Sequence, residues 1–129
     1  MAILAATMAN GGIFKGTRLL SESTSRSFHS DPVEGDMVFW VNYLVKGGVS
    51  VEKAPTDATP EQRLSAEGLE GCHGWIGYGG SVIQWHPGMN IGFAFVPTFL
   101  YGIDIDNRRG KNLLREVLCC AEKRALESP

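Results

Sequence analysis

The order of apolar and polar positions predicts helices at both ends of the chain. Residues 1–9 are almost entirely apolar and are followed by Asn10-Gly11-Gly12, a typical helix stop. No capping residue precedes this run, so it resembles the end of a helix whose beginning is missing. Ser21 is a natural N-cap for a second short helix, which Asp31-Pro32 would end.

The middle of the chain predicts a strand and a long loop. Residues 37–46 are rich in Val, Phe, Trp and Tyr, which favours a strand. Gly47-Gly48 interrupts it, and residues 49–51 can resume it. Residues 54–71 are polar, so a loop is expected there, with room for a short helix over residues 60–67.

Two strands joined by a turn are predicted in the second half. Residues 81–86 form the first strand, Pro87-Gly88-Met89-Asn90 the turn, and residues 91–96 the returning strand. Alternation places Ile91, Phe93 and Phe95 on one side and the small residues Gly92, Ala94 and Val96 on the other. The small side lets another element approach closely, and we expect the final helix there.

That final helix is predicted over residues 108–126, with Asp106-Asn107 as its cap. Its apolar stripe at helical spacing consists of Leu114, Val117, Leu118, Ala121 and Ala125. Cys120 lies at the edge of this stripe and is expected in the core, whereas Cys119 lies nearer the polar side and is expected to be partly exposed.

Composition limits the possible functions. A length of 129 residues predicts one domain, and a formal charge of −2 without a basic stripe argues against nucleic acid as a partner. No apolar run approaches the roughly 18 residues of a membrane span. The three cysteines show no metal or redox spacing, so no metal and no cofactor are expected. Unpaired cysteines, and no basic stretch before Lys15 that would suit a signal peptide, favour an intracellular location.

Motifs for chemistry are sparse. His29, His73 and His86 lack the spacing of a helical zinc site, and neither a GxSxG elbow nor a phosphate loop is present. His86 is interpreted as a turn histidine. Ser50-Val51-Glu52-Lys53 matches Ser-x-x-Lys by letters, but its β-branched surroundings do not favour the helix that this motif requires.

The segment from Gly74 to Ser81 contains four glycines ahead of a strand. Glycine in such a place lets a ligand or another backbone come close. The equal alternative is a glycine-rich β-bulge at the edge of a sheet.

Two stretches of the chain carry a resemblance to a known family. The first is LAATMANGG over residues 4–12, followed by GTRLLS over residues 16–21. The second is GWIGYGGS over residues 74–81, followed by HP at 86–87 and GFAFVP over 92–97. Their order and spacing resemble the serine β-lactamase-like hydrolases, namely class C β-lactamases, penicillin-binding-protein-like esterases and animal β-lactamase-like proteins.

The resemblance implies a fold and a site. The fold would be α+β, the antiparallel sheet portion of a β-lactamase/transpeptidase-like fold with a C-terminal helix packed on it. Where the family has Lys/His-Thr/Ser-Gly, this chain has Trp75-Ile76-Gly77, so only the glycine matches. Trp75 and Ile76 would line the pocket, and Gly77, Gly79 and Gly80 would let the backbone approach substrate. The backbone N–H of Tyr78 would help to bind the oxyanion.

The family's Ser-x-x-Lys helix and Tyr-x-Asn motif are missing. The chain is therefore expected to be the C-terminal part of a β-lactamase-related domain, with a helical segment over 1–29, a strand and variable loop over 30–73, and the hairpin and terminal helix over 74–129. Acyl-serine hydrolysis of an ester, amide or β-lactam belongs to the full-length parent, and we expect this chain alone to be inactive.

Its expected partner is the missing N-terminal part of the same fold or another protein, and a small-molecule acyl substrate binds only in the parent. The alternatives are a non-catalytic pseudoenzyme or protein-interaction module, and an unrelated small α+β binding domain.

Overall fold

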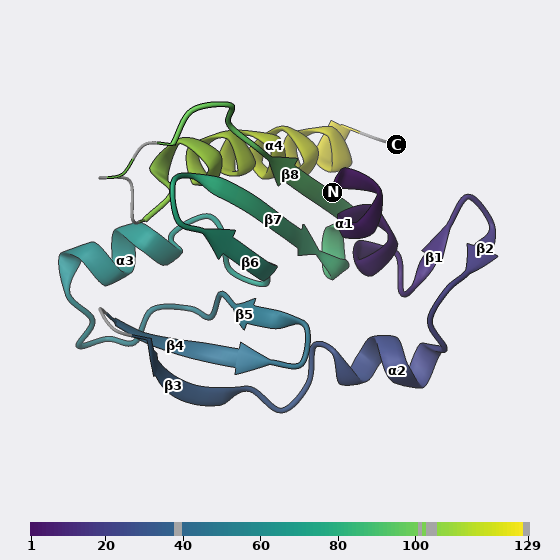
Figure 1. Cartoon of the computed structure of the whole chain (residues 1–129), viewed down its shortest axis with the longest axis horizontal. Coiled ribbons are helices and arrows are strands. Elements are labelled where there is room, and N and C mark those ends of the chain that lie inside the picture. Colours follow the sequence, from purple (N-terminus) through teal and green to yellow (C-terminus); the bar gives the residue numbers. More distant parts are fainter. Residues whose placement is uncertain (38–39, 101, 103–105, 128–129) are drawn as a thin grey trace.

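The computed structural model describes residues 1–37, 40–100, 102 and 106–127, and it is an α+β structure (Figure 1). Six antiparallel strands form one sheet whose spatial order follows the chain. The strands are β3 (Val33–Met37), β4 (Trp40–Val45), β5 (Gly48–Ser50), β6 (His73–Gly77), β7 (Ser81–His86) and β8 (Ile91–Phe95). The expected antiparallel sheet and C-terminal helix are confirmed.

The remaining elements surround this sheet. They are α1 (Ala2–Ala9), the small hairpin β1 (Ile13–Phe14) and β2 (Thr17–Arg18), α2 (Glu22–Ser27), α3 (Pro60–Ala66), the 3-10 turn η1 (Pro87–Met89) and α4 (Arg108–Glu127). Ser21 caps α2 as predicted, its hydroxyl accepting the Thr24 N–H. A capping box between Thr59 and Gln62 begins α3.

Helices α1 and α4 cover opposite faces of β7 and β8. Ala5, Met8, Ala9 and Trp85 form one core cluster on the α1 side. The prediction that α4 packs on the small-residue side of β8 is wrong. A Cβ at Gly92 would lie 2.2 Å from the backbone nitrogen of Ala6, so α1 occupies that side.

Helix α4 packs on the other side, where Ile91 and Phe93 lie beside a second core cluster of Leu69, Cys72, Leu114 and Leu118. The placement of Cys120 in the core is wrong, because its thiol is exposed, as is that of Cys119. Two residues along a helix correspond to a rotation of about 200°, so a helix that buries Leu118 turns Cys120 away from the core.

The sequence missed β3. One strand was predicted over 37–46, whereas the structure has a hairpin of β3 and β4, and residues 38–39 lie outside the described residues. Strand β3 lies at the edge of the sheet, and its residues Val33 and Glu34 are both exposed. Its sequence therefore lacks the alternation of apolar and polar residues that predicts a half-buried strand. Among the described helices, none has the length and apolarity that a membrane crossing requires.

Candidate functional site

The glycine-rich segment forms the end of β6 and the turn into β7. The pair Gly77–Ser81 closes the ladder around a three-residue turn, and the Gly80 N–H donates to the Gly77 carbonyl at 3.2 Å. Gly79 and Gly80 have φ angles of +92° and +110°, which residues other than glycine rarely adopt. The first role of these glycines is therefore the hairpin turn.

The segment between β8 and α4 packs around this turn. A Cβ at Gly79 would lie 2.4 Å from Cδ2 of Leu100, and one at Gly80 would lie 3.0 Å from the Arg109 guanidinium. Tyr78 is 75% exposed, and its hydroxyl donates to the carbonyl of Gly102 at 3.0 Å. The space beside Gly79 and Gly80 is thus occupied by this chain's own side chains.

Trp75 and Ile76 point to opposite faces of the sheet. Trp75 pairs with Ile83, which packs in the cluster beneath α1, and its side chain is 46% exposed. Ile76 pairs with Val82, which contacts the α4 side at Gly110. A ligand on one face of β6 would therefore contact only one of these two side chains.

In the residues that the structure describes, the outer edge of β6 has no paired strand beside the predicted site. Strand β5 pairs with β6 only through Val49–Gly74 and Ser50–His73. In the described part of the chain, no strand pairs with residues 75–77 on that side. An open edge offers backbone N–H and C=O groups to a ligand.

No family model, curated protein or solved structure matches the chain. The roles assigned to Trp75, Ile76, Tyr78 and the neighbouring glycines therefore stay predictions.

A cluster of ring side chains lies on the α1 face, and sequence reasoning missed it. The Trp85 indole N–H donates to Nε2 of His29 at 2.7 Å, and the His29 and His73 ring centroids are 4.7 Å apart. Nδ1 of His73 is buried and has no hydrogen-bond partner in the described part of the chain. Burial, His29 and His86 lower the pKa of His73 to about 4, although Glu52 acts in the opposite direction. The only signal in the sequence was the position of His73 directly before the glycine-rich segment.

The Ser-x-x-Lys letters do not form a catalytic motif. Ser50 ends β5 and is buried, and its hydroxyl donates to Glu52 at 2.6 Å. Residues 51–53 are irregular, so Lys53 does not lie one helical turn from Ser50. As expected from the β-branched surroundings, these residues do not form the helix that the motif requires.

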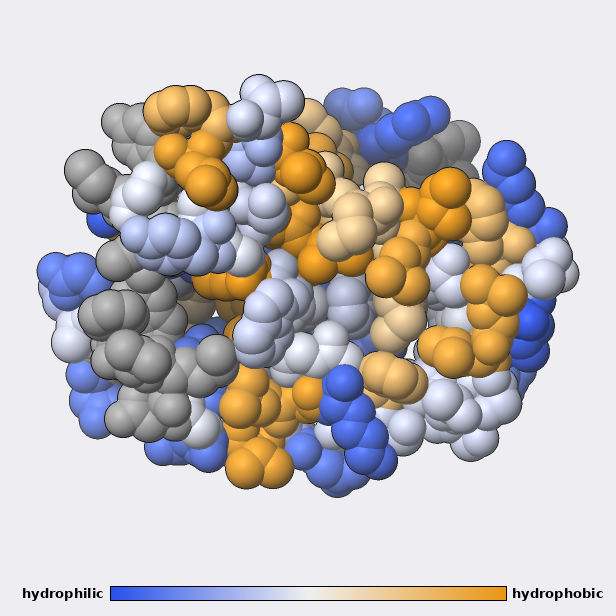
Figure 2. Space-filling model, viewed as in Figure 1, coloured by the Kyte–Doolittle hydropathy of each residue, from blue (hydrophilic) through white to orange (hydrophobic). Residues whose placement is uncertain are grey.

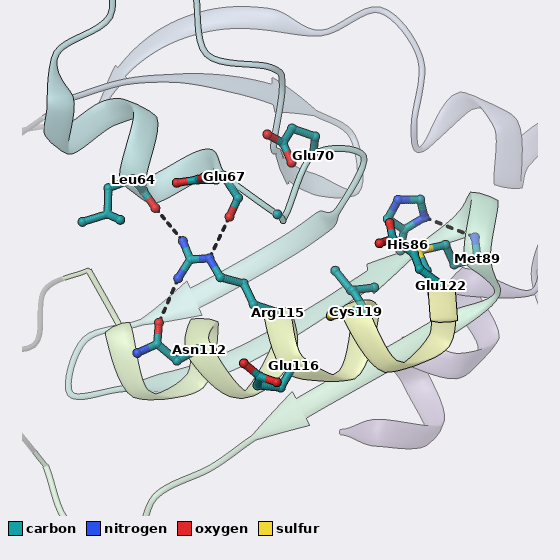
Figure 3. A pocket seen from close by; sticks show the side chains of 12 residues that line it. Leu64, Glu67, Glu70, His86, Met89, Asn112, Arg115, Glu116, Cys119 and Glu122 are labelled. Carbon is teal, nitrogen blue, oxygen red and sulfur yellow. Dashed lines mark hydrogen bonds between the residues drawn. The ribbon is translucent and has the colours of Figure 1, made fainter. Parts of the chain in front are cut away.

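One cavity of about 440 Å³ lies between α3, η1 and α4 (Figure 3). The Arg115 side chain crosses this cavity and donates to the carbonyls of Leu64 at 2.6 Å and Glu67 at 2.7 Å. These hydrogen bonds cap the C-terminal end of α3. Nδ1 of His86 accepts the Met89 N–H at 3.2 Å, as expected for a turn histidine. These polar groups serve the protein's own turns and helix ends.

A second cavity of about 440 Å³ runs between β8 and α4 and is mainly apolar. Its lining residues are Phe93, Ala94, Phe95, Leu113, Glu116, Val117 and Cys120. Apolar surface is also visible in Figure 2 around α1 and the β7–β8 half of the sheet. Neither of these two cavities is lined by residues 75–80.

The buried thiol has no nucleophilic role at neutral pH. Burial and the nearby charge of Glu70 raise the pKa of Cys72 to about 12, so the thiol stays protonated. Within the described ranges, no group of three or more His, Cys, Asp or Glu side chains is arranged to hold a metal ion.

Proposed function

We propose that this chain supplies the substrate-binding strand and the oxyanion-side backbone of a β-lactamase-related serine hydrolase. The observation that carries the proposal is the open edge of β6 at residues 75–77, which leads directly to Tyr78. An acyl substrate can bind such an edge through main-chain hydrogen bonds. A backbone N–H stabilises an oxyanion whatever side chain it carries, so the loss of the family's polar pair leaves this role intact.

Ser50 and Ser65 do not supply a nucleophile. Ser50 is 4% exposed and donates to Glu52. Ser65 accepts a hydrogen bond from Nζ of Lys111, and that ammonium also pairs with Asp106. We therefore assign acyl-serine chemistry to the full-length parent and not to this chain alone.

Binding is tested by titrating the isotope-labelled chain with benzylpenicillin and following the backbone amide resonances. We expect shifts at Gly77 and Tyr78 and none on β3. Tyr78→Pro removes the N–H and should abolish them, whereas Tyr78→Phe keeps the N–H and should preserve them. Shifts that are absent, that occur elsewhere, or that survive in Tyr78→Pro would contradict the proposal.

Catalysis is tested separately with p-nitrophenyl butyrate and the purified chain. We expect no turnover above that of matched Ser50→Ala and Ser65→Ala variants, because Ser50 is buried and the Ser65 hydroxyl is held between Lys111 and Asp106. Turnover that disappears in one of these variants would show that this chain carries its own nucleophile.

A non-catalytic interaction module is the second candidate. The observation that favours it is the apolar cavity beside β8, where Leu113 and Val117 remain 48% and 40% exposed. Self-association of the chain, measured by sedimentation equilibrium over increasing concentration, is expected to decrease in Val117→Lys and to persist in Glu122→Lys. A chain that stays monomeric at every concentration, or equal association in both variants, would count against this candidate.

A further inference from the structure

Among the described residues, two hydrogen bonds attach the segment that follows α2 to the sheet. The Gly47 N–H, in the turn between β4 and β5, donates to the carbonyl of Phe28 at 3.0 Å. The Trp85 indole N–H donates to Nε2 of His29 at 2.7 Å. The second bond is a side-chain contact between this segment and β7, so it can be altered without changing the backbone.

The Trp85–His29 bond requires a neutral imidazole. An indole nitrogen can only donate, so Nε2 of His29 must carry a free lone pair. A proton on Nε2 would place two donors 2.7 Å apart and remove the bond. A charged imidazole carries a proton on both ring nitrogens, so this hydrogen bond cannot form when His29 is charged.

His73 strengthens this requirement. Its ring centroid lies 4.7 Å from that of His29, so a charge on one imidazole opposes a charge on the other. Burial lowers the pKa of His29 below its ordinary value, against a backbone hydrogen bond to Ser25 that raises it. Both histidines are thus held neutral at pH 7.

The other charged groups near the pair are few. Glu52, after β5, favours a proton on His73, and His86 on β7 disfavours it. Glu22 and Arg26 of α2 are 72% and 76% exposed and lie 3.9 Å from each other, on the solvent side. Asp31, beyond His29, is exposed and accepts a hydrogen bond from Ser30.

We propose that the His29–Trp85 contact is a proton-operated latch, which holds the α2 segment on the sheet while His29 is neutral and releases it when His29 is protonated. For a histidine whose folded-state pKa is lowered, the stabilisation is complete above its unfolded pKa of about 6.5 and is lost as the pH falls through the folded value. The latch is therefore closed at pH 7 and opens on acidification. It is independent of the proposed hydrolase role.

The test follows the Trp85 indole N–H by ¹H–¹⁵N NMR of the full chain from pH 7.5 to 4.5. We expect one transition with a midpoint below 6.5, accompanied by shifts of the α2 amides and loss of exchange protection at the indole. An indole resonance that does not change over this range would overturn the latch, and this measurement needs no variant.

Variants then identify the group that titrates. In His29→Gln the side-chain oxygen can still accept the indole N–H but takes up no proton, so the transition should disappear. His86→Gln is the comparison variant, since His86 bonds to Met89 and not to Trp85, and the indole transition should keep its wild-type amplitude there. A transition of wild-type amplitude in His29→Gln, or one lost only in His86→Gln, would assign the event to another group and overturn the proposal.

Discussion

Replacing Gly92 with alanine is expected to destabilise the protein by about 3 kcal/mol, a large effect for one methyl group. A Cβ there would lie 2.2 Å from the Ala6 nitrogen and 2.4 Å from the Ala5 carbonyl carbon. Both atoms belong to the backbone of α1, so no side-chain rotation relieves the clash. The helix must move away from β8, which opens the cluster containing Met8 and Trp85. Urea denaturation gives the free energy of unfolding.

Gly77→Ala is the matched control on the same sheet. A Cβ at Gly77 would have its nearest neighbour, Cβ of Ser81, at 3.5 Å, which is an ordinary contact. Alanine also reduces the conformational entropy of the unfolded chain relative to glycine. We therefore expect the free energy of unfolding to change by less than about 1 kcal/mol. If Gly92→Ala were as stable as Gly77→Ala, the close packing of α1 on β8 would be wrong.

The glycine at position 92 also shows where sequence reasoning stops. Alternation along β8 correctly indicated a small-residue side that another element approaches closely. It could not decide between two helices, because α1 and α4 both offer apolar residues and the choice depends on which face each connection reaches. Local signals were more reliable: the cap at Ser21 and the turn at residues 87–90 were predicted correctly, because both depend on neighbours in sequence.

The same distinction applies to the site. The sequence marked residues 74–81 as a glycine-rich segment ahead of a strand, because glycines and strand formers are read from consecutive residues, but it did not predict that residues 73–77 are themselves a strand. The ring cluster could not be predicted, since His29 and Trp85 are 56 positions apart and meet only after α2 folds against the sheet. His73 and Trp85 are cross-strand partners, and that register is fixed by the β6–β7 turn and not by either residue.

Asp106→Ala is expected to destabilise the protein by about 3 kcal/mol, because it strands a buried cation. The Lys111 side chain is only 9% exposed, and its Nζ lies 2.5 Å from Oδ1 of Asp106. That ammonium also donates to Oγ of Ser65 at 2.8 Å, and the Ser65 hydroxyl donates to Asp106 at 3.1 Å. The three groups join α3 to the start of α4. Without the carboxylate, the hydrogen-bond acceptor left to the Lys111 ammonium is the neutral hydroxyl oxygen of Ser65.

A double-mutant cycle separates the pair from its surroundings. Lys111→Met leaves Asp106, which at 26% side-chain exposure is reached by water, so this change should cost less than Asp106→Ala. The double variant should be more stable than Asp106→Ala alone, because methionine removes the stranded charge.

Glu22→Ala provides the exposed comparison. Its carboxylate pairs with Arg18 at 3.6 Å and with Arg26 at 3.9 Å, and all three side chains are at least 40% exposed, so we expect a loss of stability below about 0.5 kcal/mol. If Asp106→Ala cost no more than Glu22→Ala, the Lys111 ammonium would have to reach water in solution. The junction between α3 and α4 would then depend on Arg115 and the Leu114–Leu118 contacts instead.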